Sequence, residues 1–357
     1  MSSNNRKLQY SLAINEAMHQ MMGSDPSVFL IGQGVKSPWY VGNTARGLLE
    51  KFGESRVIDT PVSENAITGA AVGAAIAGMR PIVVHPRIDF MMYGLDPIIN
   101  EAANWHYMFG GKSHVPVVIW GIINRGGEQA AQHSQALHAL FAHIPGLKVV
   151  MPSTPYDAKG LMISAIKDDN PVMYFDDRWL YSVEAHVPEE SYSVPIGKGI
   201  VRKRGKDVTL VSVSYMAHES LKAAEYLAGN GIDVEMIDLR TVKPLDVELI
   251  LGSVQKTGRL VVADGGWKSF GIAAEVSALV CEKAFDNLNA PIMRVALPDC
   301  PAPASGVLEK AYYPTWKNIA HTIEELLGNG HSKRRGNGLQ SEIRKTGRGI
   351  QEDQTGD

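Results

Sequence analysis

The chain has 357 residues, of which 45% are hydrophobic and 20% charged, and its formal net charge is −3. This length predicts two domains of ordinary size with extensions, and so weak a net charge gives no indication of a nucleic-acid-binding protein. The two cysteines, Cys281 and Cys300, are too few for a disulfide framework or a cysteine metal site, and they favour packed thiols in a reducing compartment.

The sequence shows no targeting segment. Its first residues, MSSNNRKLQY, are polar and lack the apolar core of a signal peptide. The longest run of small and apolar residues, 66–79, is shorter than the roughly 20 residues that cross a bilayer. We therefore expect a cytoplasmic protein that has neither a nucleic acid nor a membrane as its partner.

Strands and helices alternate along the first half of the chain. Apolar periodicity predicts helices at 8–22, 44–52, 66–79, 94–110, up to about 141, and 156–167, with strands at 28–31, 57–58, 81–84, 115–120, 149–151 and 172–175. Short apolar strands that alternate with helices are typical of a parallel sheet covered on both faces.

A second unit of the same kind follows a change of composition. Residues 177–197 carry Pro188, Pro195 and scattered acids without sustained periodicity. Beyond them, strands are predicted at 208–213, 234–237, 259–263 and 292–295, and helices at 218–228, 272–280, 307–311 and 316–327. The fold class predicted is therefore α/β, with two doubly wound parallel-sheet domains at 7–180 and 201–327, a linker at 181–200 and a disordered tail at 328–357.

Residues 58–90 contain the most informative stretch. Glu64 immediately precedes a helix made of Ala, Gly, Val and Ile, in which Gly69 and Gly73 share one face. Such a face allows another backbone to come close. Glu64 has two explanations at this point. It is a carboxylate favoured by the dipole at a helix N-terminus, or a partly buried carboxylate that shares a proton with a nitrogen of a ligand.

Other candidate residues lie at the ends of predicted strands. His133 follows a loop with a Gly-Gly pair and precedes a helix, and active-site groups favour such loop ends, although a lone histidine is more often structural. For Phe90, spacing alone favours core packing. His85 and Arg87 follow an apolar strand directly, where the crevice of a parallel sheet opens. Contact with a substrate anion is therefore an alternative to a purely structural role.

Several common catalytic motifs are absent from the sequence. It contains no Walker-type phosphate loop and no GxGxxG after a strand, and also no serine nucleophile elbow and no HExxH. The chain therefore offers an acid and a histidine without a phosphate-binding loop of its own.

These segments, in their order along the chain, resemble a known family. The β subunits of thiamine-diphosphate-dependent 2-oxo acid dehydrogenases, which are transketolase-like, show similar motifs. The resemblance covers about residues 7–327 and is carried by DTPVSENAITGAAVGAAIAGMRP, AAQHSQALHALFAHIPGLKVVMPSTPYDAKGL, IKDDNPVMYF, DVEMIDLRTVKPLD and KTGRLVVADGGW. It implies a pyrimidine-binding N-terminal domain and a C-terminal domain that mainly builds the assembly.

The resemblance also implies a shared active site. In the family an α subunit holds the diphosphate and its Mg²⁺ through a GDG…NN motif, which is absent here, and the assembly is α2β2. The implied reaction is decarboxylation of a 2-oxo acid and transfer of the acyl group to a lipoyl carrier. Two alternatives stay open: a two-subunit transketolase-like or acyloin-forming carboligase without a lipoyl partner, and a non-catalytic scaffold subunit.

Residue roles follow from the same resemblance. Glu64 matches the glutamate that hydrogen-bonds the pyrimidine ring and activates the cofactor. Val62 matches a residue whose backbone contacts the aminopyrimidine. Phe90 matches an aromatic residue that packs on that ring, and His133 matches a histidine that assists acyl transfer. A structural potassium loop is implied at Val117, Ala165, Ile166, Asp168 and Asn170, since carbonyl oxygens suit a hard cation.

Two stretches depart from the family pattern. Val84 and His85 replace an acidic residue followed by Phe or a similar residue, and WGIINRGGE replaces an RxPxG-like loop before His133. Both stretches are expected near the substrate. We therefore hypothesise a specialised member acting on a polar or anionic 2-oxo acid or a sugar-derived ketone. His85, Arg87 and Arg125 are the candidate substrate contacts.

Overall fold

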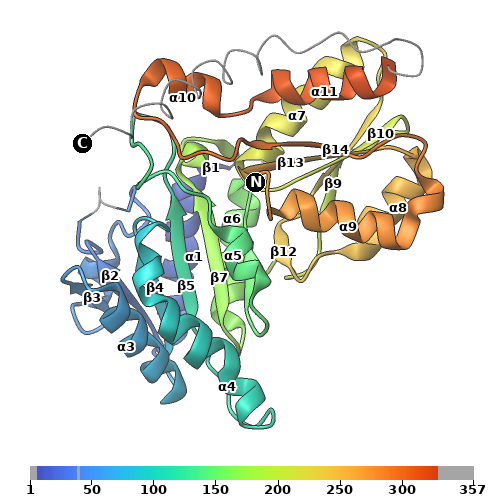
Figure 1. Cartoon of the computed structure of the whole chain (residues 1–357). Helices are drawn as coiled ribbons and strands as arrows, with labels where there is room; N and C mark the ends of the chain where they lie inside the picture. The colour runs from blue at the N-terminus through green and yellow to red at the C-terminus, as the bar shows by residue number, and fades with distance from the viewer. Residues whose placement is uncertain (1–5, 38–40, 329–357) are drawn as a thin grey trace, which may run out of the picture.

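The computed structural model describes residues 6–37 and 41–328, which form two α/β units (Figure 1). The prediction of two doubly wound, mostly parallel α/β domains is confirmed. In the part of the chain described, no helix is long and apolar enough to span a membrane. The final stretch predicted to be disordered lies outside the described residues, apart from Gly328, which ends the last helix.

The first unit is built on a seven-stranded sheet in the order β12-β6-β7-β5-β4-β2-β3. All neighbouring pairs are parallel except β12 with β6. The strands are β2 (Val28–Gln33), β3 (Val57–Thr60), β4 (Arg80–His85), β5 (Val118–Ile123), β6 (Lys148–Val150), β7 (Val172–Asp177) and β12 (Thr241–Lys243). The α-helices are α1 (Tyr10–Ser24), α2 (Leu48–Phe52), α3 (Glu64–Ile76), α4 (Ala103–Met108), α5 (His138–His143) and α6 (Pro155–Lys167).

Both faces of this sheet are buried. In β4, Ile82 and Val84 pack into the cluster that contains α1 and α6, whereas Val83 packs into the cluster that contains α3. Alternation along a strand sends successive side chains to opposite faces, so apolar residues are needed at every position. This explains why the strands read as continuous apolar runs.

The second unit contains a five-stranded sheet in the order β14-β13-β10-β11-β9, in which only the edge strand β9 is antiparallel. Its strands are β9 (Ile200–Lys203), β10 (Val208–Ser212), β11 (Val234–Asp238), β13 (Leu260–Trp267) and β14 (Met293–Leu297). Its α-helices are α7 (Tyr215–Gly229), α8 (Val247–Thr257), α9 (Ile272–Ala284), α10 (Gly306–Tyr312) and α11 (Trp316–Gly328).

Some elements differ from the sequence-based expectations. The strand expected at 115–120 lies at 118–123, because Pro116 has no N–H to donate to a ladder. The helix expected at 94–110 divides into a 3₁₀ turn, Phe90–Gly94, a π-helical turn, Pro97–Ala102, and α4. The helix expected at 44–52 forms only over Leu48–Phe52.

Four strands and one α-helix were not predicted: β1 (Lys7–Gln9), β8 (Glu184–His186), β9, β12 and α8. Asp246 accepts a hydrogen bond from the Leu249 amide and so caps α8 in the manner typical of a helix start. The expected linker, 181–200, carries a short strand, β8 (Glu184–His186), which pairs with β1 (Lys7–Gln9). The small strand β12 extends the first sheet although its residues lie beyond β11 in the chain.

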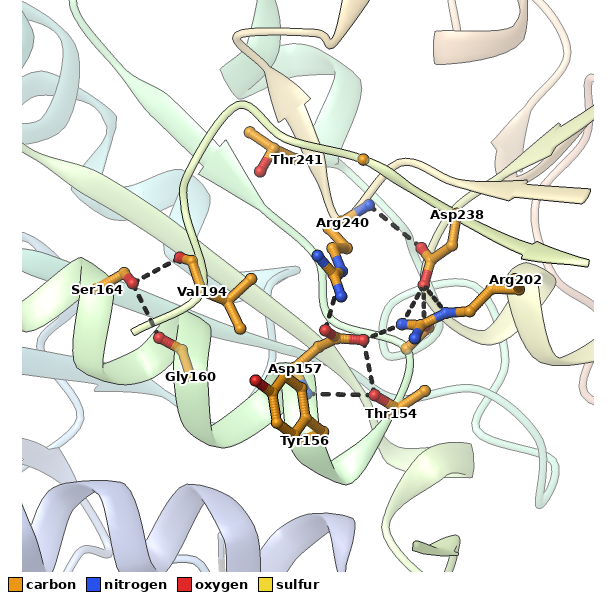
Figure 2. A network of polar contacts seen from close by, with 12 residues as sticks. Thr154, Tyr156, Asp157, Gly160, Ser164, Val194, Arg202, Asp238, Arg240 and Thr241 are labelled. Carbon is orange, nitrogen blue, oxygen red and sulfur yellow. Dashed lines mark hydrogen bonds and ion pairs between the residues drawn. The ribbon is translucent and has the colours of Figure 1, made fainter. Parts of the chain in front are cut away.

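A buried network of charges joins the two units (Figure 2). Arg202 of β9 pairs with Asp157 of α6 and with Asp238 of β11, where Nη2 lies 2.8 Å from Oδ2. Arg240 Nε lies 2.9 Å from Asp157 Oδ1. Burial lowers the pKa of Arg202, but the two carboxylates outweigh burial and the pKa is raised. Because removing one partner would leave buried charge uncompensated, this network fixes the units against each other.

Candidate active site

A cleft of about 310 Å³ lies at the carboxyl ends of the parallel strands of the first unit. The ends of β2, β3 and β4 meet at this edge because the three strands are parallel neighbours. The residues lining the cleft come from strand ends, from the start of α3 and from the segment before α5: Gln33, Val62, Glu64, Ile67, Val84, His85, Pro86, Arg87, Phe90, Tyr93 and His133. Six of these residues are candidates predicted from the sequence: Val62, Glu64, His85, Arg87, Phe90 and His133.

The predicted cofactor residues share this cleft. Glu64 is the first residue of α3 and is half-buried. Val62, two residues earlier, is 67% exposed, and Phe90 is also partly exposed. The ring of Phe90 meets that of His133 edge to face, with centroids 5.3 Å apart. A carboxylate therefore lies among exposed apolar side chains, an arrangement that suits an aromatic heterocycle carrying a hydrogen-bonding nitrogen.

His85 is buried at the floor of the cleft, with 1% of its surface exposed. Its Nε2 lies 3.1 Å from Thr68 Oγ1, and its Nδ1 has no hydrogen-bond partner among the described residues. Burial lowers the pKa of His85 to about 4. The imidazole is therefore neutral near pH 7, so it offers a substrate a hydrogen bond and no positive charge.

Two cleft neighbours that sequence reasoning missed support the segment that carries His133. Asp89 is buried, and its Oδ1 accepts a hydrogen bond of 3.1 Å from the Gln135 amide. Burial raises the pKa of Asp89, and the bond from Gln135 opposes that rise. Gln129 accepts a 3.0 Å hydrogen bond from Arg87. In the sequence Asp89 lies close to His85 and Arg87, which indicates a polar stretch after the strand, whereas no local pattern indicates the contact of Gln129.

Arg125 does not lie in the cleft. Its Nε is 2.9 Å from Asp177 Oδ2, its Nη1 donates to the Gly265 carbonyl at 3.4 Å, and only 4% of its side chain is exposed. The prediction of a substrate contact at Arg125 is thus replaced by a structural role. Its charge is already paired with a carboxylate from the end of β7.

The residues of the implied potassium loop lie together, away from the cleft, between β5, the end of α6 and the turn before β7: Val117, Ala165, Ile166, Asp168 and Asn170. Arg80 Nη1 donates to the carbonyls of Ile166 and Asp168, at 3.0 and 3.1 Å. Asn170 Oδ1 is buried without a hydrogen-bond partner among the described residues. Lys148 Nζ lies 2.5 Å from Asp168 Oδ2, so two protein cations, Arg80 and Lys148, already contact oxygens of this loop.

No catalytic metal cluster accompanies the cleft. Within residues 6–37 and 41–328, no group of three or more His, Cys, Asp and Glu side chains could hold a metal ion. The described cleft therefore supplies an acid, two histidines and aromatic surface, without a set of carboxylates for a divalent cation.

Comparison with known proteins gives the family. The model of the transketolase pyrimidine binding domain matches residues 6–183, and that of the transketolase C-terminal domain matches residues 197–319. The acetoin:2,6-dichlorophenolindophenol oxidoreductase subunit beta of Cupriavidus necator is 47% identical over 335 residues, which cover 91% of this chain and 99% of that protein. The mitochondrial pyruvate dehydrogenase E1 component subunit beta of Bos taurus is 43% identical over 320 residues, which cover 88% of this chain and 89% of that protein.

The chain belongs to the transketolase-like family of 2-oxo acid dehydrogenase β subunits. The resemblance expected from the sequence motifs is thereby confirmed. A solved structure described as a split gene transketolase, inactive beta4 tetramer, superposes with a TM-score of 0.73 at 21% identity and covers 90% of this chain and 98% of its own. That likeness supports the two-domain fold alone.

The neutral state of His85 gives this β subunit a predictable response to acid. The unfolded chain protonates His85 near its ordinary value of 6.5, whereas the folded chain resists protonation down to about pH 4. Unfolding therefore takes up a proton in this range, and folding stability falls as the pH falls. Between pH 7 and pH 5 we expect His85 to remove about 2 kcal/mol of stability.

The measurement is urea unfolding of the wild type and of His85→Gln at both pH values. The variant should lose about 2 kcal/mol less than the wild type on acidification. The exposed His321 provides a matched control, since His321→Gln should follow the wild type. Equal acid sensitivity of His85→Gln and the wild type would show that His85 is not held neutral.

Proposed function

We propose that this chain is the β subunit of a thiamine-diphosphate-dependent enzyme that decarboxylates a 2-oxo acid and passes the acyl group to a lipoyl carrier. The observation that carries the proposal is that Glu64, Phe90 and His133 line the same cleft. The name of one relative, a pyruvate dehydrogenase subunit, supports this reaction class. The name of the other, an acetoin oxidoreductase subunit, supports oxidation of a two-carbon acyl unit taken from a hydroxyketone.

The cleft fits the pyrimidine half of thiamine diphosphate. The cofactor, when bound, supplies the carbon chemistry of decarboxylation. Glu64 would hydrogen-bond a ring nitrogen and set its protonation, Phe90 would pack on the ring, and the backbone at Val62 would orient it. His133, beside Phe90, would exchange a proton with the reacting group during acyl transfer.

An α partner must complete the site. The described residues provide no group for a divalent metal, and the sequence has no phosphate loop, so the partner would hold the diphosphate and Mg²⁺. On α3, no neighbouring side chain or backbone lies within 4 Å of a methyl group built at Gly69 or Gly73. This open, smooth face suits close packing of a partner backbone. We propose an α2β2 assembly on this basis.

The rival functions receive less support. A carboligase or transketolase without a lipoyl partner would use the same cleft, but both named relatives are components of oxidoreductases. A non-catalytic scaffold would not require Glu64 and His133 in one cleft. The dehydrogenase function is therefore preferred.

Replacing the carboxylate of Glu64 should abolish most of the turnover. In the complex reconstituted with the α partner, Glu64→Gln removes the proton-sharing group while keeping the side-chain volume, so turnover should fall at least about 100-fold. The release of carbon dioxide from the 2-oxo acid measures this. Glu101→Gln, an exposed carboxylate of the same domain, is the control and should match the wild type. Wild-type turnover by Glu64→Gln would refute the role of this residue.

The substrate is the second part of the proposal. His85 is neutral, so it would recognise a hydroxyl or carbonyl group of the substrate, whereas Arg87 carries the charge that suits a second carboxylate. Both residues line the cleft, and His85 replaces the aromatic residue of the family pattern. We therefore propose a polar 2-oxo acid or hydroxyketone as substrate.

A panel of 2-oxo acids tests the two residues separately. His85→Phe should lower kcat/KM for hydroxylated substrates at least about tenfold relative to pyruvate, because a lost hydrogen bond to a buried polar group is costly. Arg87→Thr should lower kcat/KM only for substrates with a second carboxylate. Unchanged ratios of kcat/KM between the substrates in both variants would contradict the proposed substrate class.

We also propose that the loop containing Asp168 and Asn170 binds potassium. The support is the buried Asn170 Oδ1, which lacks a hydrogen-bond partner among the described residues. An ion bound there would share or displace the carbonyls of Ile166 and Asp168 that Arg80 now binds. A bound ion stabilises the folded state by mass action, so replacing choline by K⁺ at equal ionic strength should stabilise the chain by about 1–3 kcal/mol at saturation.

Thermal denaturation in the two salts measures this potassium effect. Asn170→Ala should lose the effect, whereas the same change at the exposed Asn230, which follows α7 in the second unit, should retain it. Identical melting temperatures of the wild type in K⁺ and choline would exclude the potassium site.

A further inference from the structure

The segment between β5 and α5, residues 124–137, carries His133 and is attached to the second unit. We call it the His133 segment. It contains Gly126 and Gly127, and also Glu128 and Ala130, all with positive φ. L side chains avoid this conformation unless the surroundings enforce it. The segment therefore owes its shape to contacts with the rest of the molecule.

The first contact is made by Arg125. It pairs with Asp177 and donates to the carbonyl of Gly265, which lies in β13 of the second unit. Its guanidinium also lies 5.9 Å from the centre of the Tyr313 ring. A buried Arg paired on one side and hydrogen-bonded on the other fixes the start of the segment against the second sheet.

The second contact is reciprocal and involves α10, which lies at the top of Figure 1. The Glu128 amide donates to Glu309 Oε2 at 3.1 Å, and the Gly306 amide donates to Glu128 Oε1 at 2.9 Å. Glu309 is 8% exposed. Its carboxylate thus holds the backbone of Glu128, a residue with φ of 61°, in the left-handed region.

The third contact lies just beyond the segment, at the first residue of α5. His138 Nε2 lies 3.0 Å from Asp264 Oδ1, and both side chains are 1% exposed. The same carboxylate oxygen accepts the Gly266 amide at 3.1 Å. Asp264 and Gly266 belong to β13, so the second unit holds the segment at its beginning, middle and end.

The opposite side of the segment faces the cleft. The Gln135 amide donates to Asp89, and Arg87 donates to Gln129. His133 lies between these two contacts in the sequence and against Phe90 in space. The segment therefore bridges the second unit and the cleft wall.

We propose that the C-terminal domain positions His133 in the cleft, with Glu309 as the principal positioning residue. The proposal rests on the proposed role of His133 in acyl transfer. It gives the C-terminal domain a part in the reaction besides building the assembly. Glu309 acts through the backbone of Glu128 and touches no reacting atom, so its loss should change turnover more than binding.

The test uses the complete complex with the α partner and four proteins: wild type, Glu309→Ala, Glu309→Gln and Lys310→Ala. Lys310 is the exposed neighbour of Glu309 on α10 and serves as the matched control. Two quantities are measured in each: hydrogen exchange of the amides at 126–135, and steady-state kinetics with thiamine diphosphate and the 2-oxo acid.

Glu309→Ala should raise amide exchange across the His133 segment and lower kcat about tenfold, with KM and cofactor affinity unchanged. Glu309→Gln keeps an acceptor oxygen and should recover most of the turnover, and Lys310→Ala should match the wild type. In a His133→Ala background, Glu309→Ala should have no further effect on kcat.

Unchanged exchange in Glu309→Ala would overturn the proposal, as would raised exchange with an unchanged kcat. Failure of the proposed function gives a different result. In that case the wild-type complex neither binds thiamine diphosphate nor turns over. The exchange measurement then still decides whether Glu309 holds the segment.

Discussion

Parallel pairing of β2, β3, β4 and β5 is the constraint on which the cleft depends. In a parallel sheet all the carboxyl ends lie at one edge, and the residues that follow them meet there. Glu64 begins the helix after β3, Phe90 follows β4, and His133 follows β5. Three side chains that are far apart in the sequence therefore line one cleft because their strands are neighbours in register.

Buried polar pairs hold this edge in place. Desolvated charges are tolerated only with partners. Asp157 pairs with Arg202 across the two units, and Arg125 pairs with Asp177 within the first. The contact of His138 with Asp264 also joins one domain to the other. The hydrophobic cluster beneath α3 likewise continues into the second sheet, through Val211 and Ile237. The domains thus form one body around the His133 segment.

The four residues expected on the cofactor side line one cleft, whereas the surroundings of His85 and Arg125 differ from the expectation of charged substrate contacts. Val62, Glu64, Phe90 and His133 lie within motifs whose spacing is local, so each could be placed from its neighbours. The environment of His85 could not, because its burial and its contact with Thr68 depend on how α3 packs across β4. Arg125 was misassigned for a similar reason: its partners, Asp177 and Gly265, come from distant strands. The strand β12 and the contact of α10 with Glu128 are also long-range, and no local pattern indicates them.

The central claim is that this chain supplies half of a shared cofactor site. Calorimetric titration of thiamine diphosphate, with Mg²⁺ present, into the chain alone and into the chain assembled with its α partner tests that claim most directly. The account predicts saturable binding of one cofactor per β subunit in the assembled complex and no measurable binding to the chain alone. Equal affinity in the two titrations would contradict it, because a cleft without a phosphate-binding loop or a metal-binding group would then bind the whole cofactor by itself.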